Sequence, residues 1–170
     1  MPSIRRELLP GDLGEIVALH GRLYSREYGH DETFEAMVAA SVVDAAAQGF
    51  PGPREGIWVV EEDGKMVGSL GLTDEGDGEA RVRWFLVEPS LRGQGLGRVL
   101  LDELFAKVEQ AAYTRITLET FSDLEAAAHL YREHGLELVW EDTRPRWGRP
   151  AVTYQRYERA LVPSRSTLIA

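Results

Sequence analysis

The sequence predicts a mixed α/β domain in which hairpins and one parallel crossover share a sheet. Residues 56–62 and 65–73 are apolar-rich runs joined by an Asp-Gly turn, the pattern of an antiparallel hairpin. The runs at 80–87 and 115–120 flank an amphipathic segment, so a strand, a helix and a strand follow in series and imply a parallel pair. The chain of 170 residues suffices for one well-buried core and is short for two, so we expect a single domain.

The chain is expected to begin with a short strand and a helical hairpin. Residues 4–8 have the pattern of a strand, which the Pro-Gly pair after them stops. Asp12 can cap a first helix, whose apolar side chains recur at helical spacing. A second helix is expected to be capped near Asp31 and to end in the Gly- and Pro-rich segment 49–53.

The second half of the chain supplies two more helices and the rest of the sheet. The elements expected there are a helix at 95–108, a strand at 115–120, a helix at 124–133 and strands at 136–142 and 151–161. Residues 143–150 then form a loop between the last two strands. Residues 163–170 are expected to be a disordered tail, so the predicted domain spans residues 1–162.

Composition argues against several classes of protein. The chain contains no cysteine, which rules out disulfides, thiolate metal sites and a cysteine nucleophile, and we predict no metal site. The formal net charge of -9 opposes the phosphate neutralisation that nucleic-acid binding needs. No apolar run reaches the ~18 residues of a membrane-spanning helix, and the first residues lack a signal-peptide core. We therefore expect a cytoplasmic protein without nucleic-acid or membrane partners.

A glycine-rich turn between a buried strand and an apolar helix is the strongest functional signal. Its residues are Arg92, Gly93, Gln94, Gly95, Leu96, Gly97 and Arg98. A helix start presents unpaired N–H groups and the positive end of the helix dipole, so the turn is typical of an anion site, here a pyrophosphate site. Arg98 agrees with this, because a cation in a first helical turn is unfavourable unless an anion lies nearby. The turn matches neither the nucleotide P-loop nor G-x-G-x-x-G, and a tight turn without a ligand is the alternative.

Residues 92–97 also resemble the R/Q-x-x-G-x-G/A motif of the GNAT superfamily of N-acetyltransferases. The pattern Ala-x-x-Leu-Tyr-x-x-x-Gly-Leu over residues 127–136 is similar to that family's second signature, and the order of elements matches over nearly the whole chain. The resemblance implies the GNAT acyl-CoA N-acyltransferase fold. This is an α+β fold whose mixed, mostly antiparallel sheet has a splayed central parallel strand pair and is flanked by about four helices.

The resemblance further implies acetyl-CoA (coenzyme A) as the acyl donor, with no metal. The pantetheine arm would lie where the two parallel strands separate after Leu86, and N–H groups near Leu86 and Val87 would polarise the thioester carbonyl. The pyrophosphate would occupy the glycine turn, residues 92–98. Many relatives have an asparagine three residues before the position of Ala127, where this chain has Leu124. That hydrogen bond must be absent or replaced, and Leu124 could instead pack on the pantetheine arm.

Two residues are predicted to act on protons. Tyr131 corresponds to the tyrosine that often protonates the departing thiolate in this family, and a phenol holds its proton at neutral pH. A purely structural tyrosine is the alternative, since Tyr131 shares a helix face with Leu124. For the general base, Glu119 and Glu79 are candidates. Strand alternation leaves open whether Glu119 faces the splay or solvent.

The acceptor is expected to contact the first helical pair, where Tyr24, Tyr28 and His30 lie, and the segment before the last strand. The cationic and aromatic side chains of that segment are Arg144, Arg146, Trp147 and Arg149. Because arginine forks bind carboxylates, an amino-acid acceptor is one hypothesis; a subunit contact and a solvated loop are the others.

The predicted function is direct transfer of an acetyl group from acetyl-CoA to an amine, with a small-molecule amine as the expected acceptor. The alternatives are a non-catalytic acyl-CoA-binding sensor and a protein lysine or N-terminal acetyltransferase. Residues 19–29 resemble a subgroup often fused behind MarR-type regulators, although no such domain precedes them here. A homodimer through the exposed final strands is one option for the assembly.

Overall fold

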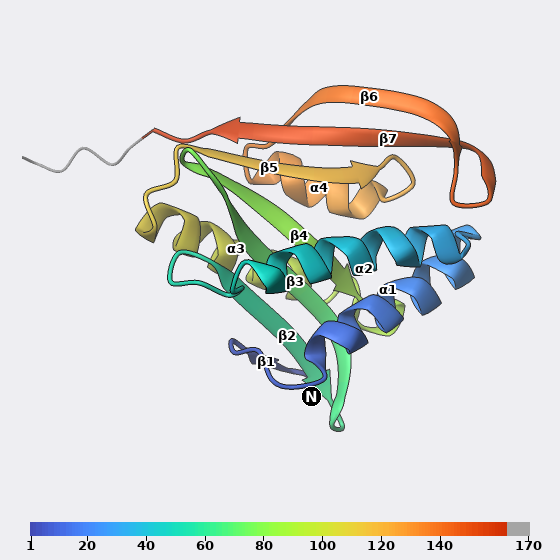
Figure 1. The fold of residues 1–170 in the computed structure, drawn as a ribbon, viewed down its shortest axis with the longest axis horizontal. Helices are drawn as coiled ribbons and strands as arrows, with labels where there is room; N and C mark the ends of the chain where they lie inside the picture. Colours follow the sequence, from blue (N-terminus) through green and yellow to red (C-terminus); the bar gives the residue numbers. More distant parts are fainter. Residues whose placement is uncertain (163–170) are drawn as a thin grey trace, which may run out of the picture.

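The computed structural model describes residues 1–162, which form one seven-stranded sheet with helices on both faces (Figure 1). The strands are β1 (Ser3–Arg5), β2 (Gly56–Glu62), β3 (Lys65–Gly76), β4 (Glu79–Val87), β5 (Arg115–Phe121), β6 (Glu137–Arg146) and β7 (Arg149–Ala160). The helices are α1 (Asp12–Tyr28), α2 (Glu32–Ala47), α3 (Leu96–Gln110), α4 (Glu125–Glu133) and a 3₁₀ turn, η1 (Pro89–Leu91). The strand order is β1-β2-β3-β4-β5-β7-β6, and only β4 and β5 pair in parallel. The predicted mixed sheet with a central parallel pair is confirmed, whereas the predicted tail at 163–170 lies outside the described residues.

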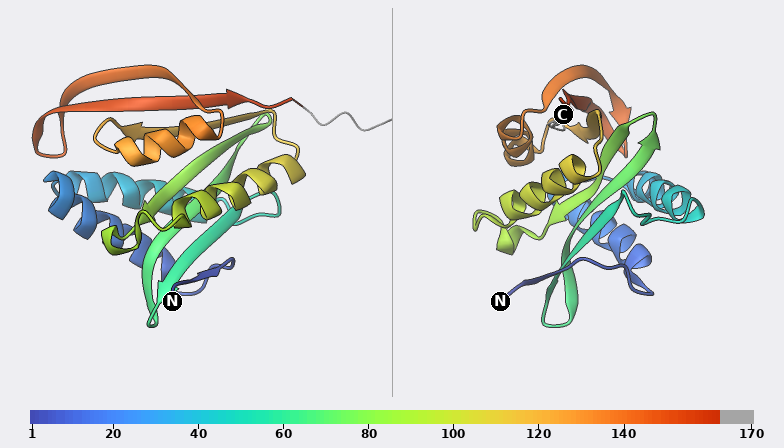
Figure 2. Two further views of the ribbon diagram at one scale, coloured as in Figure 1. Left: turned by 180° about the vertical axis from the view of Figure 1, so that it is seen from behind. Right: turned by 90° about the vertical axis from the view of Figure 1, so that its left-hand side faces the viewer.

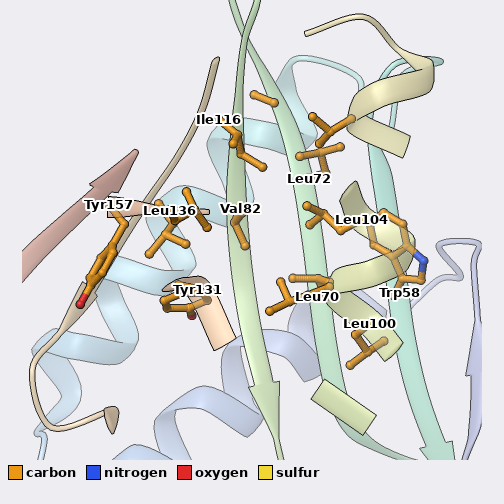
Figure 3. Close-up of a cluster of buried hydrophobic side chains, with 14 of the residues drawn as sticks. Trp58, Leu70, Leu72, Val82, Leu100, Leu104, Ile116, Tyr131, Leu136 and Tyr157 are labelled. Carbon is orange, nitrogen blue, oxygen red and sulfur yellow. The ribbon is translucent and has the colours of Figure 1, made fainter. Parts of the chain in front are cut away.

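The helices cover the two faces of the sheet in pairs. α1 and α2 pack on one face and α3 and α4 on the other, as the right-hand view of Figure 2 shows. The core beneath α3 and α4 includes Leu70, Leu100 and Tyr157, all fully buried (Figure 3). A second core beneath α1 and α2 contains Ile16 and Trp84. No helix within residues 1–162 is long and apolar enough to cross a membrane.

The helical hairpin begins as predicted at one helix and differently at the other. Asp31 caps α2, because its carboxylate accepts a hydrogen bond of 3.0 Å from the backbone N–H of Thr33. Asp12, predicted as the cap of α1, instead lies in its first turn, and the glycine before it occupies the N-cap. The Asp12 carboxylate binds Arg5 at 2.7 Å and the N–H of Leu9 at 2.7 Å. It therefore ties the first strand to the first helix.

The last hairpin is longer than predicted. β6 and β7 continue through most of residues 143–150, which were expected to form a loop, and the chain reverses at Trp147 and Gly148 with φ of 53° and 76°. Two residues at positive φ suffice for a tight hairpin turn, so no longer loop is needed. The sequence pattern could not reveal the extra strand length, because β6 is exposed on both faces and shows no apolar alternation. β3 also continues beyond its predicted end at residue 73, to Gly76.

A bulge in β4 bends this strand. Arg83 pairs with Gly71 and Leu86 with Ser69, so β4 has one residue more than β3 between the two pairs. Trp84 takes up the extra length at a φ of 49°, which is unusual for a residue with a side chain. The Ser69 hydroxyl donates a 2.6 Å hydrogen bond to the Trp84 carbonyl and holds the bulge in place.

The parallel pair separates just before this bulge. β4 and β5 pair only from Glu79 and Arg115 to Arg81 and Thr117. Beyond that point no pairing between the two strands is present in the described residues, so the sheet opens after Arg81. The predicted splay is therefore correct in kind, and its predicted start at Leu86 is wrong by five residues, because the bulge turns β4 away earlier.

Candidate active site

Two cavities meet where β4 and β5 separate. The first, which we call the turn cavity, has a volume of about 410 Å³ and lies between the end of β4, the glycine turn and α4. The second, the hairpin cavity, has a volume of about 220 Å³ and lies between the sheet and the α1–α2 hairpin. Tyr24, Phe85 and Leu124 line both. The two cavities therefore adjoin at these three side chains.

The three glycines of the turn have different physical roles. Gly93 and Gly95 have φ of 75° and 81°, a conformation that residues with a side chain rarely adopt. Gly97 lies within α3, where an added Cβ would lie 3.1 Å from Leu130 and 3.4 Å from Phe85. The first two glycines shape the turn, and the third lets α3 approach α4 and β4 closely.

The start of α3, whose Gly97 lines the turn cavity, has free N–H groups. No side chain caps the helix, and Val99 donates the first backbone hydrogen bond of its first turn, to the Gly95 carbonyl at 3.1 Å. The N–H groups of Leu96, Gly97 and Arg98 have no acceptor within residues 1–162. Such a helix start is suited to bind an anion through its backbone.

The two arginines of the turn face protein carboxylates. Arg92 donates from Nε to the Val87 carbonyl at 2.8 Å and grips Glu27 through its two terminal nitrogens at 2.7 and 2.8 Å. Arg98 pairs with Glu133 of α4 at 2.7 Å. The unfavourable place of Arg98 in a first helical turn is therefore explained by Glu133, and the sequence argument that it needs a bound anion is lost.

At the end of β4, one backbone N–H group faces the opening left where β5 has separated. In an antiparallel ladder, hydrogen-bonded pairs alternate with pairs that are not bonded to each other. Since Glu88 donates to the Val67 carbonyl at 2.8 Å, Leu86 falls in the bonded class and uses its N–H on β3. The N–H of Val87 then faces the side that β5 has left open. Of the two backbone groups predicted here, this alternation leaves Val87 free.

Tyr131 and Glu119 both line the hairpin cavity, although they belong to α4 and β5. Tyr131 is buried between the rings of Phe85 and Tyr157, at centroid distances of 6.1 and 5.8 Å, and its hydroxyl has no hydrogen-bond partner in the described residues (Figure 3). Burial raises the pKa of Tyr131 above its usual value. Glu119 lines the hairpin cavity and is also exposed to solvent; its carboxylate accepts a 2.8 Å hydrogen bond from the Tyr154 hydroxyl and lies 3.7 Å from Arg156.

Comparison with known proteins gives the chain a family. A model described as "Acetyltransferase (GNAT) family" matches residues 17–136. The chain belongs to the GNAT family. As a member it is an N-acetyltransferase that uses acetyl-CoA as donor, which agrees with the resemblance seen in the sequence.

Individual relatives extend the match. The uncharacterised N-acetyltransferase C1271.07c of Schizosaccharomyces pombe is 31% identical over 163 residues, or 92% of this chain and 94% of that protein. The uncharacterised N-acetyltransferase YjgM of Escherichia coli is 31% identical over 123 residues, or 69% of this chain and 72% of its own. The structure of YncA of Salmonella typhimurium, solved with its cofactor acetyl-CoA, shares the fold with a TM-score of 0.67 at 18% identity, and the match covers 95% of each chain.

Glu79, the other candidate base of this GNAT protein, lies away from the strand separation. Glu79 lies at the end of β4 that is still paired with β5, where Arg115 and Thr117 hydrogen-bond its carboxylate. Although burial acts in the opposite direction, these bonds lower the pKa of Glu79. Glu79 lines neither cavity. The structure therefore favours Glu119 as the carboxylate near the splay.

Of the residues predicted from the sequence to contact the acceptor, some line the cavities and others do not. Tyr24 lines both cavities and Tyr28 the turn cavity, whereas His30 packs against Trp147 and lines neither. Leu124 is the N-cap of α4 and lines both cavities.

The arginines predicted to bind a carboxylate of the acceptor form ion pairs with carboxylates of the protein. Arg144 and Arg146 bind Asp142, and Arg149 binds Asp123. None of these arginines lines the hairpin cavity. These three arginines therefore do not support the hypothesis that this segment binds the carboxylate of an amino-acid acceptor.

Two cationic residues that do line the hairpin cavity, Arg81 and Arg83, were missed. Their signal was present in the sequence, since they alternate with Ala80 and Val82 and so mark one polar face of β4. Within residues 1–162, no three acidic or histidine side chains come together as a metal site would need.

Proposed function

We propose that this GNAT acetyltransferase acetylates a small-molecule amine, which binds in the hairpin cavity and attacks the thioester directly. The observation that carries this proposal is the meeting of the two cavities at the strand separation, lined on both sides by Tyr24, Phe85 and Leu124. The hairpin cavity of about 220 Å³ has the volume of about seven water molecules. A space of this size suits a small acceptor better than a folded protein surface.

The turn cavity has the chemistry that the pantetheine arm and pyrophosphate of acetyl-CoA require. An added Cβ at Gly93 or Gly95 would meet nothing within 4 Å, so the front of the turn is open to a ligand. The free N–H groups of Leu96, Gly97 and Arg98 suit the pyrophosphate, and the backbone of Arg92 and Gln94 completes the turn. In this proposal Leu124 packs against the pantetheine arm in the place of an asparagine.

Backbone groups of β4 are proposed to stabilise the charge that develops during transfer. Acetyl-CoA supplies a thioester, whose C–S bond breaks as the amine nitrogen bonds to the acetyl carbon. The Val87 N–H, fixed by the pairing of Leu86 with β3, is a preorganised donor for the negative charge on the acetyl oxygen. Because the strand holds it in place, it needs no reorganisation at the moment of reaction.

Tyr131 and Glu119 are proposed to manage the protons. Tyr131 retains its proton at neutral pH, because burial raises its pKa, and it can deliver that proton to the departing thiolate. Glu119, with Tyr154 on one carboxylate oxygen, can accept the proton of the amine directly or through water. The two residues line one cavity from different elements, which a shared role requires.

An acceptor screen tests this proposal. The protein is incubated with acetyl-CoA and a panel of small amines, amino acids and lysine peptides, and acetylated products are detected by mass. We expect acetylation of small amines. Acetylation of peptides alone would favour a protein acetyltransferase. Thermal stabilisation by coenzyme A without any product would favour the acyl-CoA sensor.

Four further points remain predictions from the sequence. They are the cytoplasmic location, the single domain over residues 1–162, a homodimer and the kinship of residues 19–29 with regulator-fused acetyltransferases. The homodimer has a candidate surface in β6, where Leu138, Val139 and Trp140 are all exposed.

A further inference from the structure

Arg81 has no hydrogen-bond partner for its guanidinium within residues 1–162, although it lines the hairpin cavity. Its nearest carboxylates are Glu75 at 3.8 Å and Glu79 at 3.9 Å, both beyond hydrogen-bond distance. The Nε atom is buried and unpaired. A guanidinium carries five donors, and leaving them unpaired near a protein interior is unfavourable.

The carboxylates near Arg81 are already engaged by other arginines. Glu75 receives a 3.0 Å hydrogen bond from Arg83. Glu79 is bound by Arg115 and lies 3.5 Å from Arg156. Neither carboxylate can turn fully to Arg81 without giving up a closer partner.

The charges that line the hairpin cavity are therefore unequal. Arg81 and Arg83 contribute two cations and Glu119 one anion, in a protein whose formal net charge is -9. A second protonated amine on an acceptor would face these cations, whereas an anionic group would complement them. Because Glu75 already pairs with Arg83, the unpaired guanidinium of Arg81 is the group that favours an acceptor with a negative group.

The cation Arg81 and the anion Glu119 lie at different positions along the strands that border the hairpin cavity. Because Arg81 pairs with Thr117, Glu119 lies two residues farther toward the strand separation, or about 7 Å along the sheet. Tyr131, which lines the same cavity, is proposed to act at the junction itself. An amine directed to the junction, near Glu119, would leave the other end of the molecule close to Arg81.

We propose that the acceptor is a small amine with a carboxylate or similar oxyanion at the end of the molecule away from the amine, and that Arg81 binds this anionic group. This inference rests on the proposed function, since it needs the acceptor to occupy the hairpin cavity. The aromatic side chains of Trp84 and Phe121 line the cavity and suit an apolar body. Polyamines and basic lysine peptides are disfavoured by the same charges.

Matched acceptors provide the first test. γ-Aminobutyrate is compared with propylamine and 6-aminohexanoate with pentylamine, so that each pair differs only in the carboxylate; phenylalanine and leucine, whose carboxylate adjoins the amine, vary its distance from the amine. We expect kcat/KM for the best carboxylate-bearing acceptor to exceed that of its decarboxylated partner by about tenfold or more. Equal or better acetylation of the decarboxylated amines, or of spermidine, would overturn the inference and leave small-amine transfer standing.

Variants provide the second test. Arg81→Gln should raise KM for the carboxylate-bearing acceptor by about tenfold, with KM for acetyl-CoA and kinetics with the decarboxylated amine unchanged, and Arg81→Lys should restore part of the loss. Arg144→Gln, which changes an exposed arginine outside the cavity, is the control and should behave as wild type. Equal acceptor KM in wild type and Arg81→Gln would contradict the inference.

Binding without turnover separates the inference from the proposed function. Trp84 and Trp147 line the hairpin cavity, so their fluorescence can report amino-acid binding in the presence of coenzyme A. Carboxylate-dependent quenching that Arg81→Gln abolishes, without any acetylated product, would support the Arg81 site and refute small-amine transfer. Quenching that ignores the carboxylate would refute the Arg81 site.

Discussion

Arg92 and Glu27 form a two-pronged ion pair that fastens the glycine turn to α1. Their nitrogen and oxygen atoms lie 2.7 and 2.8 Å apart, and Nε of Arg92 also holds the Val87 carbonyl at 2.8 Å. The leading arginine of the motif thus faces the helical hairpin. It joins the cofactor side of the site to the helix that covers the acceptor side.

Breaking this pair should weaken cofactor binding without removing any proposed cofactor contact. Because both side chains are partly exposed, we expect Glu27→Gln to destabilise the fold by about 1 kcal/mol and to raise the Kd for coenzyme A by about fivefold. Calorimetric titration and thermal unfolding measure the two effects. Glu32→Gln, on the neighbouring helix, is the control; if both variants bind coenzyme A like wild type, the pair does not position the turn.

Tyr131→Phe should separate proton donation from packing. The Tyr131 hydroxyl has no hydrogen-bond partner among residues 1–162, so its removal leaves the buried ring and the thermal stability nearly unchanged. If Tyr131 protonates the thiolate, kcat should fall about 100-fold while affinity for coenzyme A stays the same. Tyr157→Phe is the control, because Tyr157 is fully buried and lines neither cavity; its hydroxyl accepts a 3.3 Å hydrogen bond from Arg132, so this variant should lose some stability and keep its turnover. Turnover equal to wild type would remove Tyr131 from the mechanism.

Two alanine substitutions should show why Gly97 is a glycine. In Gly97→Ala the new Cβ would lie 3.1 Å from Leu130 and 3.4 Å from Phe85, which narrows the turn cavity. We expect a several-fold weaker affinity for coenzyme A with stability changed by less than about 1 kcal/mol, since helix propensity offsets the crowding. Gly14→Ala, in α1 with nothing within 4 Å of the added Cβ, should stabilise by up to about 1 kcal/mol and leave binding unchanged. If Gly14→Ala weakened coenzyme A binding more than Gly97→Ala did, this account of the turn would be wrong.

Acid should destabilise the fold through His20. Burial lowers the pKa of this histidine to about 4, so the folded state stays neutral where the unfolded state, with a pKa near 6.5, binds a proton. Stability is therefore complete above pH 6.5 and falls as the pH drops toward 4, by about 3 kcal/mol for this residue.

Urea unfolding at several pH values measures this loss. His20→Gln, which cannot titrate, should lose less stability over that range than wild type. His129→Gln changes an exposed histidine and should keep the wild-type pH dependence. An equal acid response in wild type and His20→Gln would show that His20 is not responsible.

Local chemistry let the sequence alone determine several features. The cap at Asp31, the Asp-Gly turn at residue 63 and the glycines at 93 and 95 depend on the backbone geometry of a few adjacent residues, and each occurs where predicted. The crossover that makes β4 and β5 parallel follows from element order. The glycine motif also indicated acetyl-CoA as the donor, because a motif of a few adjacent residues can be recognised without knowing the tertiary structure.

Only the tertiary structure decided the features that join distant segments. The start of the splay depends on a bulge at Trp84 that Ser69 holds from the neighbouring strand. The partners of Arg92 and Arg98 come from α1 and α4, 65 and 35 residues away in sequence. Periodicity gives two faces of a strand without saying which one a cavity will border, and ion pairs form only between groups that packing has already brought together.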